Sequence, residues 1–194
     1  MSTTHPSYAP SIRLTGLTTA LAATALTTGA LVMAPAAHAD TTYTQQRIIN
    51  RMDGSRLAML NDSTADGAEV ISLRAPGWHF KTSRWTQIIT GSTRVIKNEA
   101  SGKCIQPATA TPKEGDRLIV RTCDGSAAQN WERPFDNVGD TSTSWGLFQL
   151  ASDPTLAIGL DTYQGSGSWN NLYLIRSQTS ADRLWRSVKD TTTP

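Results

Sequence analysis

Three tryptophans recur along this chain at similar intervals, and their spacing constrains the fold more than any other feature. Trp85, Trp131 and Trp185 lie 46 and 54 residues apart. The arginines that close the preceding apolar runs lie 47 and 55 residues apart, and they are Arg74, Arg121 and Arg176. Both sets of markers place the longer insertion in the third interval. A period near fifty residues predicts a fold built from three similar units.

Each interval contains short runs of residues that favour strands. In the second interval, KCI at 103–105 and LIVR at 118–121 are separated by a polar loop that contains Pro107, Pro112 and Gly115. Such β-favouring runs, broken by Gly, Pro, Asn and Asp, are typical of strands, and no stretch reads as a sustained amphipathic helix. We therefore expect an all-β fold with repeats at about 47–91, 92–143 and 144–189.

The second interval also carries a motif that resembles one repeat of the ricin B-type lectins. The motif consists of Gly102-x-Cys104, a second cysteine at Cys123, and Gln129-x-Trp131. The resemblance implies a β-trefoil, in which three such repeats surround a pseudo-threefold axis. The first and third intervals follow the same order of strand, turn, strand and closing tryptophan, so they supply the other two repeats.

The first thirty-nine residues are typical of an export signal. Arg13 is the only basic residue among them, and no acidic residue occurs before Asp40. A weakly apolar run at 14–33 and the small residues Ala37 and Ala39 predict cleavage after Ala39 and secretion. A membrane anchor is the alternative, but the run is rich in Thr and Gly, and no basic cluster follows it.

Cleavage leaves 155 residues, which is enough for one ordinary domain. The formal charge of +2 falls to +1 without Arg13, so neither nucleic acid nor membrane insertion is expected. In an exported chain the two cysteines most simply form one disulfide, Cys104–Cys123. Residues 40–46 are expected to be an extended arm, suited to strand addition to a partner, and residues 190–194 a tail.

The closing tryptophans are expected in the core, because a threefold fold needs the same large apolar side chain in every repeat. These core residues are Trp85, Trp131 and Trp185. Gln129 is expected to use its amide to satisfy backbone groups beside the second tryptophan.

The resemblance implies galactose-like ligands, bound by an Asp after the first strand's apolar residue, an aromatic platform at the end of the next strand, and an Asn before Q-x-W. A carboxylate binds sugar hydroxyls, and an aromatic face stacks on the ring. Here other residues fill these positions: Ala58, Gln106 and Ala157; then Arg74, Arg121 and Arg176; then Thr82, Ala128 and Asp182. We expect no complete site of the family's kind, with Gln106 as a remnant.

Aromatic residues outside the repeating pattern are further candidates for ligand contact. Trp78 and Phe80 belong to an irregular segment between Arg74 and Trp85, while Tyr163 and Trp169 belong to a Gly/Ser-rich loop. The alternative is that they fold back to cover the barrel floor. The three arginines that end the apolar runs are either solvated or form an anion site.

Motif counting gives no support for catalysis, for a cofactor or for a metal. After cleavage His79 is the only histidine, and neither G-x-S-x-G nor a phosphate-binding glycine motif occurs. We therefore predict a secreted, non-catalytic binding module that recognises a glycan. One alternative is a protein-docking adapter or targeting subunit of a secreted toxin complex. The replacement of the family's sugar-binding residues favours this alternative. A Kunitz-type protease inhibitor is the second alternative, although those trefoils lack Q-x-W.

Overall fold

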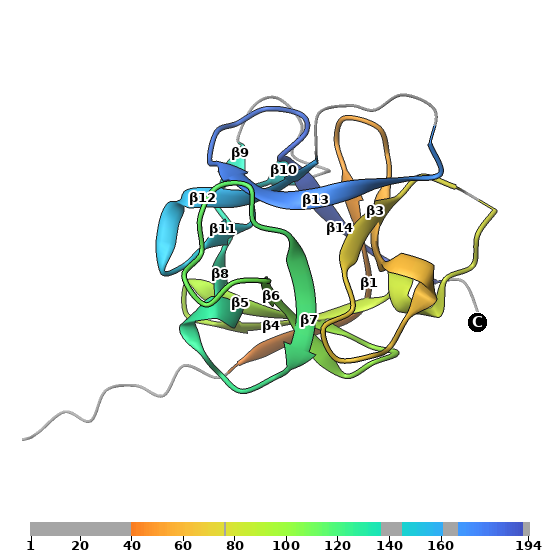
Figure 1. Ribbon diagram of the computed structural model, residues 1–194, viewed down its shortest axis with the longest axis horizontal. Coiled ribbons are helices and arrows are strands. Elements are labelled where there is room, and N and C mark those ends of the chain that lie inside the picture. The colour runs from red at the N-terminus through yellow and green to blue at the C-terminus, as the bar shows by residue number, and fades with distance from the viewer. Residues whose placement is uncertain (1–39, 76, 137–144, 161–166, 192–194) are drawn as a thin grey trace, which may run out of the picture. The chain divides into compact units, whose positions relative to one another are not determined.

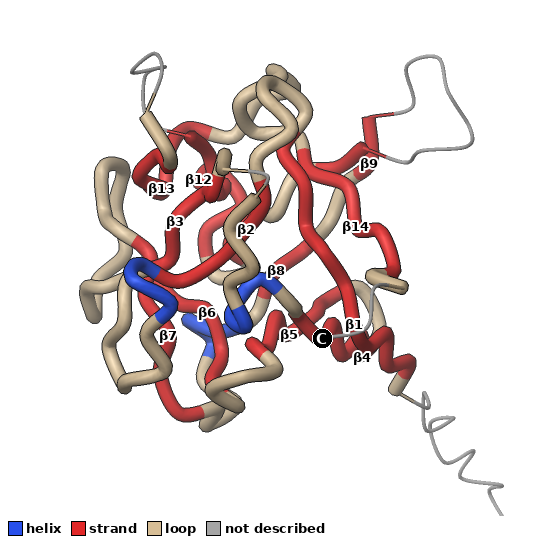
Figure 2. The backbone as a smooth tube through the Cα atoms, turned by 90° about the vertical axis from the view of Figure 1, so that its right-hand side faces the viewer, coloured by secondary structure: helices blue, strands red, loops and turns tan. Residues whose placement is uncertain are grey.

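The computed structural model describes residues 40–75, 77–136, 145–160 and 167–191. Within these ranges the chain forms fourteen strands and three one-turn 3-10 helices (Figure 2). The first repeat contains β1 (Thr41–Asn50), β2 (Arg56–Met59), β3 (Val70–Leu73) and β4 (Trp85–Thr90). The second contains β5 (Thr93–Asn98), β6 (Lys103–Pro107), β7 (Leu118–Thr122) and β8 (Trp131–Glu132). The third contains β11 (Gln149–Leu150), β12 (Asp153–Leu160), β13 (Trp169–Arg176) and β14 (Trp185–Lys189).

The remaining elements are short. A pair of two-residue strands, β9 (Phe135–Asp136) and β10 (Trp145–Gly146), lies between the second and third repeats and joins β14. The 3-10 helices η1 (Leu60–Asp62), η2 (Lys81–Ser83) and η3 (Ala127–Gln129) occupy loops of the first two repeats. No helix in the described part of the chain has the length and apolar character needed to cross a membrane.

The strand pairing is that of a β-trefoil. The outer strands of the repeats pair in the order β14, β1, β4, β5, β8 and β11, which forms the barrel wall. The inner strands form three hairpins, β2–β3, β6–β7 and β12–β13. Each hairpin is bridged to the next, since β3 pairs with β13 and two single bridges join Glu69 to Ile119 and Arg117 to Tyr173 (Figure 1). The three hairpins therefore meet around one axis.

The three closing tryptophans are fully buried and make the same contact in each repeat. Their indole N–H groups donate to the carbonyls of Leu57, Ile105 and Ile158 at 3.0, 3.2 and 3.0 Å. Each bond ties the last strand of a repeat to its own hairpin and satisfies the one polar atom of the ring, so the large apolar surface is buried without an unpaired donor. The core is thus threefold in geometry as well as in composition.

Residues 41–46 are not a free arm. They begin β1, where Thr41, Thr42 and Tyr43 pair with Ile89, Ile88 and Gln87 of β4. One backbone edge of residues 41–43 is used by the chain's own sheet, so this segment is part of β1, which corrects the expectation of a free arm.

Cys104 and Cys123 form the expected disulfide, with their Cα atoms 5.1 Å apart. The bond joins β6 to the residue that follows β7, so it closes the open end of the second hairpin.

Candidate ligand-binding surfaces

The strand register fixes which residues are equivalent in the three repeats. Arg56, Cys104 and Ala157 lie opposite Ile49, Lys97 and Gln149, respectively, and the residues after them accept the tryptophan N–H bonds. The next position, where the lectin family has its Asp, is therefore occupied by Ala58, Gln106 and Gly159. In the third repeat the sequence pattern alone places this position at Ala157, two residues before Gly159.

The strand register also corrects the residues assigned to the family's aromatic platform. Opposite Arg56, Cys104 and Ala157 on the neighbouring strands lie Leu73, Arg121 and Ile175. Arg74 and Arg176 come one residue later and correspond to Thr122. Because successive strand residues point to opposite faces, the three arginines do not form one symmetric ring. Of the three, Arg121 alone occupies the platform position.

The outer face of the first repeat is apolar. Ala58 and Leu73, which occupy the Asp and platform positions, form with Ile71 a second cluster of buried residues apart from the main core, and Phe80 packs against them. Trp78 stacks on Phe80 with a centroid separation of 5.5 Å and an interplanar angle of 17°. Trp78 remains 45% exposed, so the stack presents a flat aromatic surface to solvent.

Hydrogen bonds fix the loop that carries this stack. Arg56 donates through Nη2 to the carbonyls of Ala75 and Trp78, and the Trp78 N–H donates to the Ala75 carbonyl at 3.3 Å. On the far side, the carboxylate of Asp62 accepts from the backbone N–H groups of η2. The aromatic surface is therefore held in place before any ligand arrives.

Trp169 extends this surface from the third repeat. It is the first residue of β13, not a loop residue as expected, and it pairs directly opposite Leu73 of β3. Directly opposed residues project from the same face of a sheet, so Trp169, which is 37% exposed, lies on the face of the apolar cluster. We call Trp78, Phe80 and Trp169 the aromatic shelf. Tyr163 lies outside the described residues.

A bonded polar group supports the junction of β3 and β13 on the face opposite to the shelf, since Arg74 and Asn170 directly follow Leu73 and Trp169. The backbone N–H groups of Arg74 and Ala75 donate to the carbonyl of Ser168 at 2.8 and 3.2 Å, which ties β3 to the segment before Trp169. The Arg74 guanidinium forms an ion pair with Asp53 at 3.0 Å, and this carboxylate also accepts from Asn170 at 3.1 Å.

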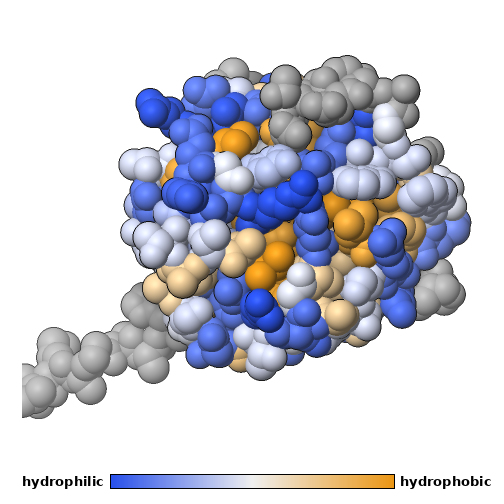
Figure 3. Space-filling view, viewed as in Figure 1, coloured by the Kyte–Doolittle hydropathy of each residue, from blue (hydrophilic) through white to orange (hydrophobic). Residues whose placement is uncertain are grey.

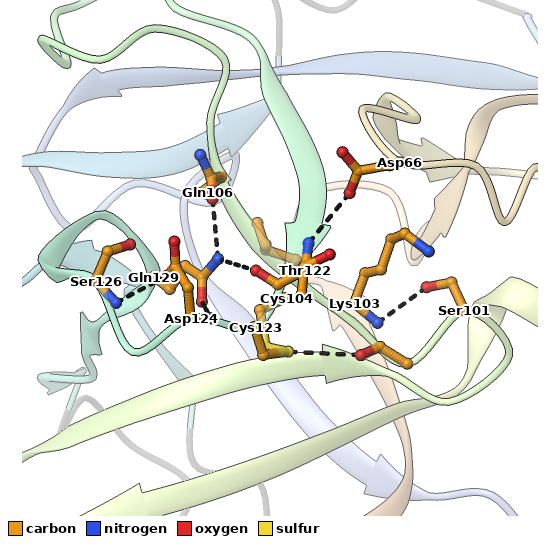
Figure 4. The surroundings of a disulfide bond; sticks show 12 residues. Asp66, Ser101, Lys103, Cys104, Gln106, Thr122, Cys123, Asp124, Ser126 and Gln129 are labelled. Atoms are coloured by element: carbon orange, nitrogen blue, oxygen red, sulfur yellow. Dashed lines mark hydrogen bonds between the residues drawn. A yellow bond between two sulfur atoms is a disulfide. The ribbon is translucent and has the colours of Figure 1, made fainter.

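The equivalent face of the second repeat is polar. Gln106 accepts a hydrogen bond from the buried Gln129 at 2.9 Å, and Gln129 also donates to the Thr122 carbonyl and accepts from the Asp124 N–H (Figure 4). In Figure 4 the amide nitrogen of Gln106 points away from Gln129, and it has no hydrogen-bond partner among the described residues. Gln129 thus holds the chain after β7, and one donor of Gln106 stays available.

An ion pair covers the rest of this face. Arg121 contacts Asp66 at 2.7 Å, and the other oxygen of Asp66 accepts from the Thr122 N–H at 3.1 Å. The hydrogen bond from Arg121 holds the pKa of Asp66 below its ordinary value, with a smaller contribution from the Thr122 N–H. Both side chains are about half exposed, so solvent screens the pair.

In the third repeat the family's position is filled by a neighbouring side chain. A Cβ atom on Gly159 would lie 1.9 Å from Cδ1 of Ile175, so Ile175 occupies the space that a side chain would need. Tyr173, opposite Gly159, is covered by Arg117, whose guanidinium carbon lies 5.5 Å from the ring centroid. A side chain at position 159 would require Ile175 to move, and glycine itself supplies no carboxylate to bind a sugar.

The described residues contain no group of three or more His, Cys, Asp and Glu side chains arranged to hold a metal ion. His79 lies exposed in the loop between Trp78 and Phe80. Sequence reasoning found the aromatic residues of the shelf, but it did not place Trp169 opposite Leu73, because that placement follows from the β3–β13 pairing.

No family model matches the sequence, and no curated protein is similar enough to match it. Solved structures do match, at low identity. The designed threefold-symmetric protein ThreeFoil matches with a TM-score of 0.63 and 21% identity over 74% of this chain and 96% of its own. A Macrolepiota procera ricin B-like lectin, in complex with lactose, matches with a TM-score of 0.58 and 15% identity over 75% and 96%. A mosquitocidal holotoxin matches with a TM-score of 0.62 and 17% identity over 78% of this chain, which spans 17% of the holotoxin. The fold of this chain is therefore a β-trefoil, similar to that of ricin B-like lectins.

Proposed function

We propose that the protein is a secreted, non-catalytic carbohydrate-binding module whose contact surface is the aromatic shelf. The observation that carries this proposal is the stack of Trp78 on Phe80, which is held rigid while Trp78 stays 45% exposed. An exposed aromatic surface has an unfavourable hydration free energy that ligand contact relieves. A flat indole face also complements the C–H face of a sugar ring, which is apolar on one side and hydroxylated at its rim.

The surroundings of the shelf suit the same ligand. His79 is exposed beside the stack and offers a polar group to a ligand bound there. A polar group beside an apolar platform helps to orient a hydroxylated ligand. The N-terminal signal pattern and the disulfide support secretion, because disulfides persist in oxidising compartments.

A glycan array tests this function. The protein should bind one defined glycan class saturably, and Trp78→Ala should weaken that binding at least tenfold, about 1.4 kcal/mol. Tyr43→Ala is the matched control, since Tyr43 is also exposed, at 51%, but lies on β1 outside the shelf. Equal loss in both variants, or binding that survives Trp78→Ala, would exclude the shelf as the sugar contact.

A protein-docking role is the second candidate, and one comparison favours it. The match to a mosquitocidal holotoxin places this fold within a much longer chain. A rigid aromatic surface is also typical of the centre of protein interfaces. A blank array from folded protein, together with a binding partner that is lost with Trp78→Ala, would support docking instead.

A further inference from the structure

The third repeat contains an open hollow of about 590 Å³ that lies apart from the family's sugar positions. Its lining includes Glu114, Gln149, Pro154, Leu156, Arg176 and Ser177. Glu114 comes from the β6–β7 loop of the second repeat, while the others come from β11, β12 and the end of β13. The hollow therefore lies where two repeats meet.

The third hairpin is closed by a backbone hydrogen bond, from the Ser177 N–H to the Thr155 carbonyl at 2.7 Å, and lacks the side-chain bridge of the other two. In the second repeat, Cys104 and Cys123 join the two strands of the hairpin covalently. In the first repeat, the equivalent residues are joined by the hydrogen bond from Arg56 to the Ala75 carbonyl at 3.2 Å. The equivalent pair in the third repeat is Ala157 and Ser177. The side chain of Ala157 has no polar atom, and the hydroxyl of Ser177 accepts a hydrogen bond from the Gln149 side chain at 2.6 Å.

The arginine at the hollow also differs from the other two strand-end arginines. Arg74 and Arg121 form ion pairs with Asp53 and Asp66 at 3.0 and 2.7 Å. Within the described ranges, the Arg176 guanidinium has no carboxylate within ion-pair distance.

The turn at the start of β12 also holds an aspartate, Asp153, but among the described residues it forms no ion pair with Arg176, whereas Asp53 pairs with Arg74. The pairing of β11 with β12 shifts register between Gln149 and Leu150. Asp153 in this turn binds Thr155 through both the backbone N–H, at 3.1 Å, and the hydroxyl, at 2.6 Å. Arg176 lines the hollow, and its guanidinium forms no hydrogen bond or ion pair with the residues that the structure describes.

Glu114 supplies an acceptor close to these donors. One oxygen of its carboxylate accepts from the backbone N–H of Arg176 at 3.4 Å, a long bond that leaves most of its capacity free. The hollow thus has a cationic donor, an anionic acceptor and the hydroxyl of Ser177. Pro154 and Leu156 add an apolar wall.

We propose that this hollow binds an uncharged sugar unit with vicinal hydroxyl groups. A guanidinium donates two parallel hydrogen bonds and a carboxylate accepts two, so the pair can hold neighbouring hydroxyls from opposite sides. The apolar wall of Pro154 and Leu156 contacts the C–H face of the ring. Because the charges of Arg176 and Glu114 offset each other, the hollow favours a ligand without net charge. The inference rests on the proposed carbohydrate function and adds a second site, separate from the shelf.

Amide NMR titrations of the full-length protein with methyl β-D-galactopyranoside and methyl α-D-mannopyranoside test this site. At least one of these sugars should shift the backbone signals of Leu156, Arg176 and Ser177 saturably. Arg176→Ala and Glu114→Gln should each weaken the fitted Kd about tenfold. Arg121→Ala is the matched control, because it removes a strand-end arginine that does not line the hollow. Thermal unfolding of each variant verifies that the exposed substitutions leave the fold intact.

Three results would overturn the site. The first is the absence of shifts at the hollow with both sugars. The second is equal weakening by Arg121→Ala. The third is binding of D-galacturonate or sulfate, but of neither neutral sugar, with Glu114→Gln increasing the affinity, since that pattern defines an anion site. Failure of the shelf is distinguishable: if array binding survives Trp78→Ala but is lost with Arg176→Ala, the shelf proposal is wrong and the hollow is the sugar site.

Discussion

The first and second repeats have the same core and opposite outer faces. On the first, Ala58, Ile71 and Leu73 are buried beneath Phe80. On the second, the equivalent positions hold Gln106, Ile119 and Arg121. Gln106 accepts a hydrogen bond from the side-chain amide of Gln129, and Arg121 forms an ion pair with Asp66. Figure 3 shows one side of the molecule, where apolar clusters interrupt a largely hydrophilic surface.

The difference shows which positions the β-trefoil requires. Each repeat must place a tryptophan whose N–H reaches a hairpin carbonyl, and the barrel strands must pair in register. The outer hairpin positions carry no such requirement, so one repeat has become an aromatic shelf while another retains polar groups. Substitutions of the shared core tryptophans should therefore affect the repeats equally, whereas substitutions on the hairpins and outer faces should affect them differently.

Truncating a shared core residue should have the largest effect. Trp131→Ala removes a fully buried indole and its bond to the Ile105 carbonyl, so it should lower the free energy of unfolding by about 3–5 kcal/mol. Trp85→Ala should cost about the same, because the contact is equivalent. Urea unfolding measures both. A loss under about 1 kcal/mol for either variant would mean that the two tryptophans do not contribute equally to the stability of the core.

The side-chain bonds that close the hairpins should contribute differently to stability in the first and second repeats. Replacing both Cys104 and Cys123 by Ala opens a loop with a sequence separation of 19 residues and should lower the free energy of unfolding by about 2–4 kcal/mol. Arg56→Ala removes the corresponding hydrogen bonds in the first repeat and should cost about 1–2 kcal/mol. Denaturant unfolding of the two variants ranks them, and a larger loss for Arg56→Ala would reverse the comparison.

The two stacked aromatic residues should separate stability from binding. Phe80 packs on the apolar cluster, so Phe80→Ala should lower the free energy of unfolding by about 1–2 kcal/mol. Trp78 is largely exposed, so Trp78→Ala should cost less than about 1 kcal/mol and act mainly on glycan binding. Thermal unfolding and array binding of both variants measure this. If Trp78→Ala destabilises the protein more than Phe80→Ala, Trp78 is a structural cover and not a platform.

The ion pair on the second repeat should have the smallest effect, and the effect should depend on pH. The folded pKa of Asp66 lies below its unfolded value, so the pair stabilises the fold above the unfolded pKa, and that contribution is lost as the pH falls through the folded pKa. In Arg121→Ala the pKa of Asp66 should rise towards its ordinary value. Carboxyl-carbon NMR titration measures this shift. An unchanged pKa would show that Arg121 does not contact Asp66 in solution.

The sequence predicted the fold because its signal is repeated. The spacing of the tryptophans and the β-favouring runs between them required three similar units, and neither depends on the exact register of a strand. The register of the third repeat was not predictable in this way. Residues 156–160 of β12 are all buried, so hydrophobicity does not alternate there and gives no sign of which residues face outward. The pairing of β11 with β12 also shifts register between Gln149 and Leu150, whose partners are Ala157 and Asp153, and the sequence pattern does not reveal this shift.

The candidate surfaces were predictable only in part. Trp78 and Phe80 stood out because they interrupt the repeating pattern. Glu114 and Gln149 did not, because common polar residues in a loop and at a strand end carry no signal of their own. Their proximity comes from the contact between two repeats, and sequence spacing does not report contacts between segments so far apart.

The most direct test is an indole NMR titration with the glycan that binds best on the array. The protein has six tryptophans, and their indole N–H signals separate the exposed shelf from the buried core. Addition of the glycan should shift the signals of Trp78 and Trp169, while those of Trp85, Trp131 and Trp185 stay unchanged. If the Gln106 side-chain amide shifts and the indoles of Trp78 and Trp169 do not, sugar recognition lies on the polar face of the second repeat and the aromatic shelf is not the binding surface.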